Sequence, residues 1–85
     1  SNSGENAELS DLIHYTRRYG IKLIAMTSKA ESTLGQHADI TLLLPDVPEA
    51  CPNGLAPTTS TTMMMALGDA LAVVLLERMN LTKEQ

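Results

Sequence analysis

The residue types that could do chemistry are concentrated in one stretch, residues 49–62, which reads EACPNGLAPTTSTT. It holds a carboxylate, the single cysteine of the chain, two prolines, a glycine and five consecutive hydroxyl residues. Proline and glycine disfavour regular structure, and the last of them in this stretch is Pro57. The hydroxyl run at 58–62 is therefore predicted to stand where a loop enters a helix.

A helix start of this kind predicts an anion site. The first turn of a helix leaves its N–H groups unpaired and carries about half a positive charge, which favours phosphate. The alternative is that Thr58 or Thr59 is an ordinary N-cap. One hydroxyl is enough for a cap, so with five in a row a ligand-binding role is as probable as a simple capping role.

Glu49 is the first candidate for a catalytic carboxylate, because it follows an apolar strand and precedes the hydroxyl run. Partial burial would raise its pKa toward neutrality, which suits a general base. An exposed loop glutamate is the alternative, and the more common situation.

Cys51 lies in a Cys-Pro turn and is expected to be a small packed residue rather than a nucleophile. His14 and His37 have no metal-ligand spacing with it, so no metal site is expected.

The elements that must position these residues alternate along the chain. Apolar residues at helical spacing predict a helix that ends at Gly20. Unalternating apolar runs at 22–27 and 40–44 predict strands covered on both faces. Ser32 is predicted to cap a brief helix through about residue 38. The apolar stripe of the first helix consists of Leu9, Leu12, Ile13, Thr16 and Tyr19.

A last, long helix is predicted from about residue 58 to 79. Residues 63–76 are apolar nearly all round, so this helix is expected to be buried in a larger domain or against another subunit. The run is interrupted by Gly68 and Asp69 and is too short for a membrane span, so no membrane contact is expected. Asp69 is expected to be paired at a subunit or domain contact.

The order helix, strand, helix, strand, helix indicates an α/β architecture with a parallel sheet. Two strands do not form a stable sheet alone, and residues 1–5 look like a loop that follows a strand. The 85 residues are therefore expected to be the C-terminal part of a domain.

A formal charge of −4 and very few aromatic residues argue against nucleic-acid binding. One cysteine allows no internal disulfide and fits a reducing cytoplasm, the expected location.

Two motifs resemble a known family. The turn SNSGE at 1–5, followed by an apolar strand that ends at Thr27, resembles the sugar isomerase (SIS) domain. The stretch EACPNGLAPTTSTT, followed by a helix with GDALAV, resembles one branch of it, the arabinose-5-phosphate isomerases. The resemblance implies a flavodoxin-like three-layer α/β/α sandwich, of which residues 1–85 would be the C-terminal part of an SIS domain. Such domains bind sugar phosphates at the ends of their parallel strands.

The resemblance also implies roles for individual residues. The first turn would bind the sugar phosphate, and the hydroxyl run would line the same pocket. Glu5 would be the second carboxylate of the site. The alternative is that its negative charge only stabilises the N-terminal end of the helix that follows, through the helix dipole. Asn6 stands where many relatives carry threonine, so its role stays open. The implied substrate-binding residues are Ser1, Asn2, Ser3, Thr58, Thr59, Ser60 and Thr61.

Members of this branch interconvert ribulose 5-phosphate and arabinose 5-phosphate by proton transfer between C1 and C2, without a cofactor. Their product feeds the octulosonic acid of lipopolysaccharide or capsule, and a homotetramer is the expected assembly. Relatives place a lysine and a histidine before the position of Ser1, a His-Pro-Gly motif after Gln85 and often two CBS domains, so part of the active site is expected outside this chain. The alternatives are another phosphosugar isomerase and a non-catalytic sugar-phosphate sensor of a regulator.

Overall fold

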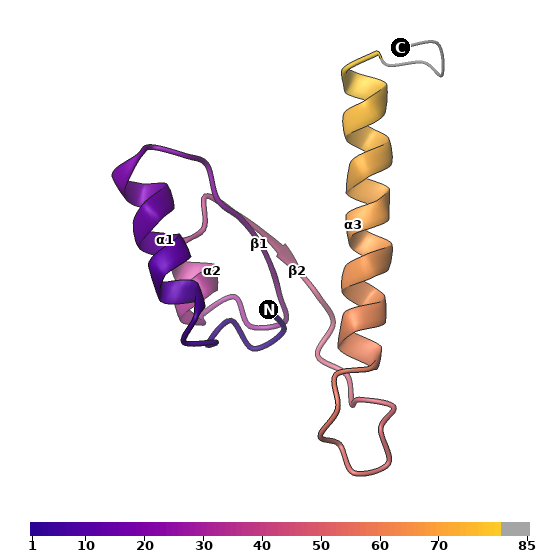
Figure 1. The fold of residues 1–85 in the computed structure, drawn as a ribbon. Helices are drawn as coiled ribbons and strands as arrows, with labels where there is room; N and C mark the ends of the chain where they lie inside the picture. The colour runs from indigo at the N-terminus through magenta and orange to yellow at the C-terminus, as the bar shows by residue number, and fades with distance from the viewer. Residues whose placement is uncertain (81–85) are drawn as a thin grey trace. The chain divides into compact units, whose positions relative to one another are not determined.

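A computed structural model describes residues 1–80 and divides the chain into two units, Ser1–Pro48 and the residues from Glu49 onward. The last residues of the predicted domain, 81–85, lie outside the described part. The first unit contains α1 (Leu9–Arg18), β1 (Ile24–Thr27), α2 (Thr33–His37) and β2 (Ile40–Leu43). The second contains α3 (Thr59–Arg78) (Figure 1). All five elements lie where the sequence predicts them.

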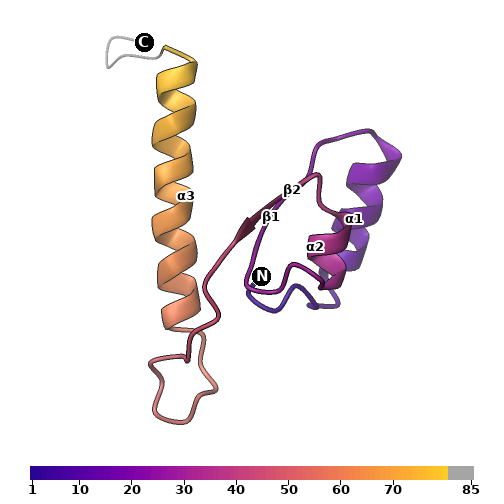
Figure 2. The ribbon, with the colours of Figure 1, turned by 180° about the vertical axis from the view of Figure 1, so that it is seen from behind.

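The two strands are parallel, as predicted, with Ile24 opposite Ile40 and Thr27 opposite Leu43. The intervening α2 makes the crossover that a parallel pair requires. Both α1 and α2 lie on the same face of the strands, as two opposite views show (Figures 1 and 2). The first unit is thus a small α/β layer pair.

Local sequence signals account for the ends of these elements. Gly20 follows the C-cap of α1 with a φ of 63°, the left-handed conformation that glycine adopts without strain. The Ser32 hydroxyl accepts a hydrogen bond from the Gly35 N–H at 3.2 Å and so caps α2. Both features agree with the sequence prediction.

The core of the first unit is small and lies between the strands and the two helices. Ile13 of α1, Ala25 of β1 and Leu34 of α2 form it, each at most 5% exposed. The predicted stripe of α1 is only partly buried, because Leu12 and Tyr19 stay at least half exposed.

Coverage of both strands on both faces is not seen within the first unit. Ile24, Ile40 and Leu43 are exposed, and both helices of this unit lie on one face of the strands.

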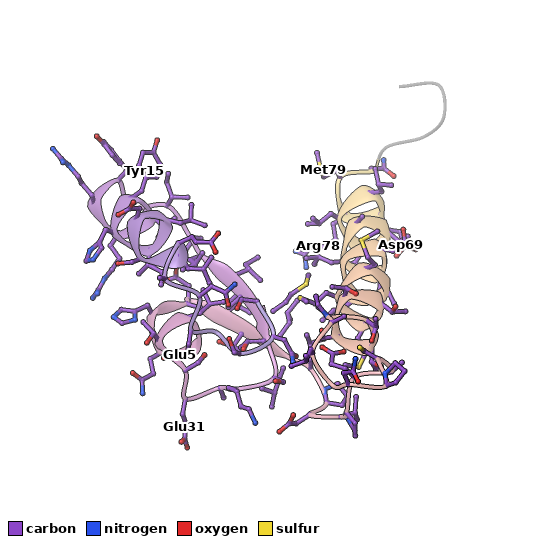
Figure 3. All side chains as sticks on the ribbon, turned by 60° about the horizontal axis from the view of Figure 1, so that its bottom comes forward. Glu5, Tyr15, Glu31, Asp69, Arg78 and Met79 are labelled. Carbon is purple, nitrogen blue, oxygen red and sulfur yellow. The ribbon has the colours of Figure 1, made fainter. Side chains whose placement is uncertain are left out.

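Burial of α3 is likewise not seen within the second unit. Ser60 is the one buried residue of this helix, and Met65 and Val73 are among its exposed apolar side chains. Asp69 is exposed and forms no ion pair among residues 1–80 (Figure 3).

By length and composition α3 could cross a membrane, contrary to the estimate from 63–76 alone, because the helix extends on both sides of that run. Core helices of soluble proteins have the same length and composition, so this is weak support for a span.

Candidate functional site

The turn at residues 1–5 lies along the carboxyl end of β1. The amino group of Ser1 donates to the Met26 carbonyl at 3.1 Å. The Asn2 carbonyl accepts hydrogen bonds from the Ser28 N–H and from the Thr27 hydroxyl, both at 2.9 Å. This is the edge at which open parallel sheets bind their ligands.

Gly4 allows this turn to pack against the start of α2. Its φ is 73°, and a Cβ on it would lie 1.9 Å from the Ser32 Oγ and 2.5 Å from the Ser32 Cβ. Its carbonyl accepts the Leu34 N–H at 3.0 Å. Glycine is therefore required here for both backbone conformation and space.

The serine hydroxyls of the turn form hydrogen bonds with Asn6, the residue whose role the sequence analysis left open. Ser1 and Ser3 donate to Asn6 Oδ1 at 2.9 and 3.4 Å. In contrast, the Asn2 Oδ1 is buried and has no hydrogen-bond partner among the described residues. A buried acceptor of this kind is costly unless a ligand or water supplies a donor.

The Glu5 carboxylate lies at the N-terminus of α2, and not only near the start of α1, the helix that follows it in the sequence. It accepts hydrogen bonds from the Thr33 N–H, through a very short contact, and from the Thr33 hydroxyl at 3.1 Å. The backbone hydrogen bond from Thr33, followed by the hydroxyl, lowers the pKa of Glu5 below its ordinary value. The carboxylate is thus held in its charged form.

Glu49 has the same arrangement at the N-terminus of α3. The Ser60 hydroxyl donates to Oε2 at 2.6 Å, and the N–H groups of Ser60 and Thr58 donate to Oε1 at 2.9 and 3.2 Å. These hydrogen bonds, the Ser60 hydroxyl first, lower the pKa of Glu49. The expected rise in pKa is wrong, because the donors favour the charged form more than partial burial disfavours it.

The anion at the start of α3 is therefore the carboxylate of Glu49 itself. Thr58 occupies the N-cap position, but its side chain makes no capping hydrogen bond. Its hydroxyl instead accepts from the N–H groups of Ala50 and Cys51 at 3.0 and 3.2 Å, which closes the 50–57 loop. Glu49 precedes Thr58 by nine residues, so this cap is a contact across the 50–57 loop that the sequence analysis did not predict.

The other hydroxyls of the run differ in their availability. Thr61 and Thr62 donate back to the Thr58 carbonyl at 2.9 and 3.0 Å. Among residues 1–80 the Thr59 hydroxyl has no such internal bond, and it lines an open pocket of about 520 Å³ together with Thr58 and Thr61. Thr59 is thus the hydroxyl of this run that is most available to a ligand.

Cys51, His14 and His37 are the remaining residues that the sequence analysis considered. Cys51 is half-buried, and backbone N–H groups, that of Ala56 first and then that of Asn53, lower the pKa of its thiol. His14 is exposed, and the Nδ1 of His37 lies 2.7 Å from the Thr33 carbonyl of its own helix. Within the described part of the chain, no group of metal-binding side chains is found.

The structure thus places the candidates in two groups. Ser1, Asn2, Ser3 and Glu5 share the turn beside β1 in the first unit. Glu49 and the residues Thr58, Thr59, Ser60 and Thr61 share the helix start of the second unit. Sequence reasoning left the role of Asn6 open and missed Thr33, whose contact with Glu5 joins residues 28 positions apart in the chain.

Curated relatives with high identity are arabinose 5-phosphate isomerases. The chain is 54% identical over 84 residues to arabinose 5-phosphate isomerase KdsD of Yersinia pestis and 49% identical to that of Pseudomonas aeruginosa. Each alignment covers 99% of this chain and 26% of the relative. The chain therefore spans about a quarter of the length of these proteins.

Solved structures of sugar-phosphate-related proteins are also similar to this chain. A protein of E. coli CFT073, solved in complex with a sugar phosphate, superimposes with a TM-score of 0.89 at 36% identity, over 99% of this chain and 45% of that one. A proposed phosphosugar isomerase involved in capsule formation, from Bacteroides fragilis, gives 0.91 at 36% identity and the same coverage. These similarities confirm the predicted α/β class, and residues 1–74 match the SIS domain. The chain belongs to the SIS domain family.

Proposed function

We propose that this chain is part of an isomerase that interconverts D-ribulose 5-phosphate and D-arabinose 5-phosphate. The observation that carries the proposal is the 54% identity over 99% of the chain to an arabinose 5-phosphate isomerase. We take the sugar phosphate bound in the similar E. coli structure to be arabinose 5-phosphate, so the same compound is the proposed ligand here.

We further propose that residues 1–85 form part of an SIS domain within a longer, cytoplasmic protein. The exposed apolar side chains of β1, β2 and α3 support this, since each would gain by burial against further elements or subunits. A homotetramer would supply such surfaces for α3. The product would enter octulosonic acid synthesis for lipopolysaccharide or capsule.

We propose the turn at 1–5 as the binding site for the phosphate group of the sugar. The Ser1 and Ser3 hydroxyls lie in it, and the Asn2 Oδ1 offers a buried acceptor to a hydroxyl of the sugar. In the second unit we propose Thr58, Thr59, Ser60 and Thr61 as contact residues, with Thr59 first because its hydroxyl lines the open pocket. Binding the remote phosphate would help to hold C1 and C2 in place for reaction.

Glu49 and Glu5 are the proposed catalytic carboxylates. Isomerisation needs a group that takes a proton from one carbon and returns it to its neighbour. Both glutamates are ionised at neutral pH and can accept a proton, but the hydrogen bonds that lower their pKa also make them weak bases. Each could therefore contribute by positioning, Glu49 through Ser60 and the start of α3 and Glu5 through Thr33.

The lowered pKa values are also compatible with a second candidate function. A protein that binds a sugar phosphate without converting it needs hydroxyls and N–H groups but no base. A non-catalytic sugar-phosphate sensor therefore fits two ionised, hydrogen-bonded carboxylates equally well. Turnover distinguishes the two functions.

The test is conversion of ribulose 5-phosphate by the complete protein that carries residues 1–85. Arabinose 5-phosphate should form, and other phosphoketoses should react more slowly. Binding of the sugar phosphate without any turnover would favour the sensor, and preferred turnover of a different phosphosugar would favour another isomerase of the family.

Three variants test the carboxylates. Glu49→Gln keeps an oxygen that can accept the Ser60 N–H but cannot act as a base, and Glu5→Gln does the same opposite Thr33. Glu31→Gln, an exposed glutamate of the loop before α2, is the matched control (Figure 3). A base is indicated if a folded Glu49→Gln loses activity by several orders of magnitude while Glu31→Gln keeps it. A folded Glu49→Gln with nearly full rate would remove Glu49 from the catalytic residues.

A further inference from the structure

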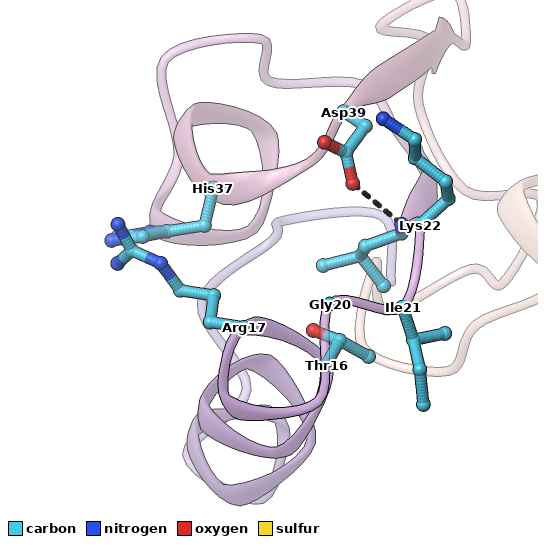
Figure 4. Close-up of a pocket in the computed structure, with 8 residues that line it drawn as sticks. Thr16, Arg17, Gly20, Ile21, Lys22, His37 and Asp39 are labelled. Carbon is cyan, nitrogen blue, oxygen red and sulfur yellow. Dashed lines mark hydrogen bonds between the residues drawn. The ribbon is translucent and has the colours of Figure 1, made fainter.

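A pocket with a different composition lies at the opposite end of the strands of the first unit. It forms where α1 returns to the start of β1, close to the residue before β2 (Figure 4). Its volume is about 380 Å³, within the range of small-ligand pockets. The turn at 1–5 is no part of its lining, so this is a separate place on the molecule.

Two of the eight residues that line this pocket are cationic and one is a carboxylate, although the chain as a whole carries a formal charge of −4. Arg17 stands in the last turn of α1 and Lys22 precedes β1. Neither forms an ion pair within residues 1–80. Asp39 is the one carboxylate of the lining, and its Oδ2 already accepts the Leu23 N–H at 2.7 Å (Figure 4).

The basic groups reach the pocket from two sides. Arg17 and His37 extend on one side, and Lys22 stands on the other, beside Asp39 (Figure 4). The contact of 2.7 Å between the Nδ1 of His37 and the Thr33 carbonyl fixes the ring with Nδ1 as the donor, so the Nε2 of the neutral imidazole is an acceptor and offers no hydrogen bond to an anion. At Gly20 a Cβ would meet nothing within 4 Å, so the main chain there is accessible as well.

We propose that this pocket binds a small phosphate-bearing anion, with Arg17 and Lys22 as its ligands. A guanidinium presents a planar set of donors that matches two phosphate oxygens, while an ammonium adds a compact charge. The site lies away from the turn at 1–5, so its ligand would act as an effector and not as a substrate. The proposal does not depend on the isomerase reaction.

Basic residues at the end of a helix have an ordinary role that must be separated from this one. Arg17 and Arg18 both stand in the last turn of α1, where cations interact favourably with the helix dipole. Arg18 is absent from the pocket lining, and its guanidinium lies 5.6 Å from the centre of the Tyr19 ring. Arg18→Gln is therefore a matched control for Arg17→Gln.

The experiment is a titration of the complete protein with inorganic phosphate, followed by the backbone amide NMR signals of residues 20–23 and 1–5. Saturable shifts at 20–23 are expected. Arg17→Gln should weaken the affinity read at these signals by about tenfold, as the loss of a charge-assisted hydrogen bond implies, and Lys22→Gln should weaken it as well. Arg18→Gln should leave it unchanged within about twofold, because Arg18 is exposed to solvent and does not line the pocket.

The outcomes separate this proposal from the proposed function. Signals at 1–5 and isomerase turnover report on the substrate site, whereas signals at 20–23 report on this pocket alone. Equal weakening by Arg17→Gln and Arg18→Gln, or no saturable shift at 20–23, would overturn the anion site. If Arg17→Gln fails to fold, Lys22→Gln decides the question, because Lys22 lies outside the helix.

Discussion

Replacing Gly4 by alanine tests how the turn at 1–5 is held against α2. The new methyl group would lie 1.9 Å from the Ser32 Oγ and 2.5 Å from its Cβ, so a rotation of the serine side chain cannot relieve the overlap. The backbone would also be strained at a φ of 73°. Strain of about 1–2 kcal/mol, together with loss of the Ser32 cap at about 1–2 kcal/mol, gives an expected loss of about 2–4 kcal/mol in the free energy of unfolding.

Gly20→Ala is the matched control for this variant. Its φ of 63° imposes the same backbone strain, but nothing lies within 4 Å of the added Cβ. It should therefore cost only about 1–2 kcal/mol. The assay is chemical denaturation of the complete protein, together with affinity for arabinose 5-phosphate, which only Gly4→Ala should reduce.

Ser32→Gly in the Gly4→Ala background removes both clashing atoms at a capping cost of a few tenths of a kcal/mol. The double variant should recover to the stability of Gly20→Ala, a coupling that a double-mutant cycle measures. Equal destabilisation by Gly4→Ala and Gly20→Ala, or no recovery in the double variant, would refute the packing of the turn against α2.

Three further predictions concern stability. Gly68→Ala should raise the free energy of unfolding by about 0.5–1 kcal/mol, since the site lies within α3 with nothing within 4 Å of the new Cβ; a decrease in a denaturation experiment would indicate that another chain packs there. Leu34→Ala should cost about 2–5 kcal/mol in the same experiment, because Leu34 is 5% exposed, whereas Leu12→Ala at 50% exposure should cost much less. The folded pKa of Glu5 and of Glu49 lies below the ordinary 4.5, so the stability that each contributes is present above pH 4.5 and lost as the pH falls through the lowered value. Glu49→Gln should therefore reduce the acid sensitivity of unfolding, and an unchanged pH profile would contradict its lowered pKa.

The positions of the elements could be predicted because local signals fix them. Gly20 and Ser32 mark helix ends, and the apolar runs at 22–27 and 40–44 contain the two strands. Burial could not be predicted in the same way, because it depends on which surfaces meet. The apolar character of α3 indicates that it should be covered, and the described residues of its unit leave it exposed.

The pKa of Glu49 was predicted less well than its position in the fold. Glu49 was selected for its place between a strand and the hydroxyl run, and it does lie at the helix start. Its pKa depends on how many donors reach it, and the Ser60 hydroxyl and N–H come from eleven residues further along the chain. Sequence spacing does not report such a contact, nor the one between Glu5 and Thr33.

The most direct test of the proposed isomerase is proton exchange at the reacting carbons. Arabinose 5-phosphate is incubated with the complete protein in D₂O, and the products are followed by proton NMR. The account predicts that ribulose 5-phosphate forms and carries solvent deuterium at C1, because the base that moves the proton between C2 and C1 exchanges it with water. Tight binding of arabinose 5-phosphate with no ribulose 5-phosphate and no exchange would contradict an isomerase and leave a sugar-phosphate sensor.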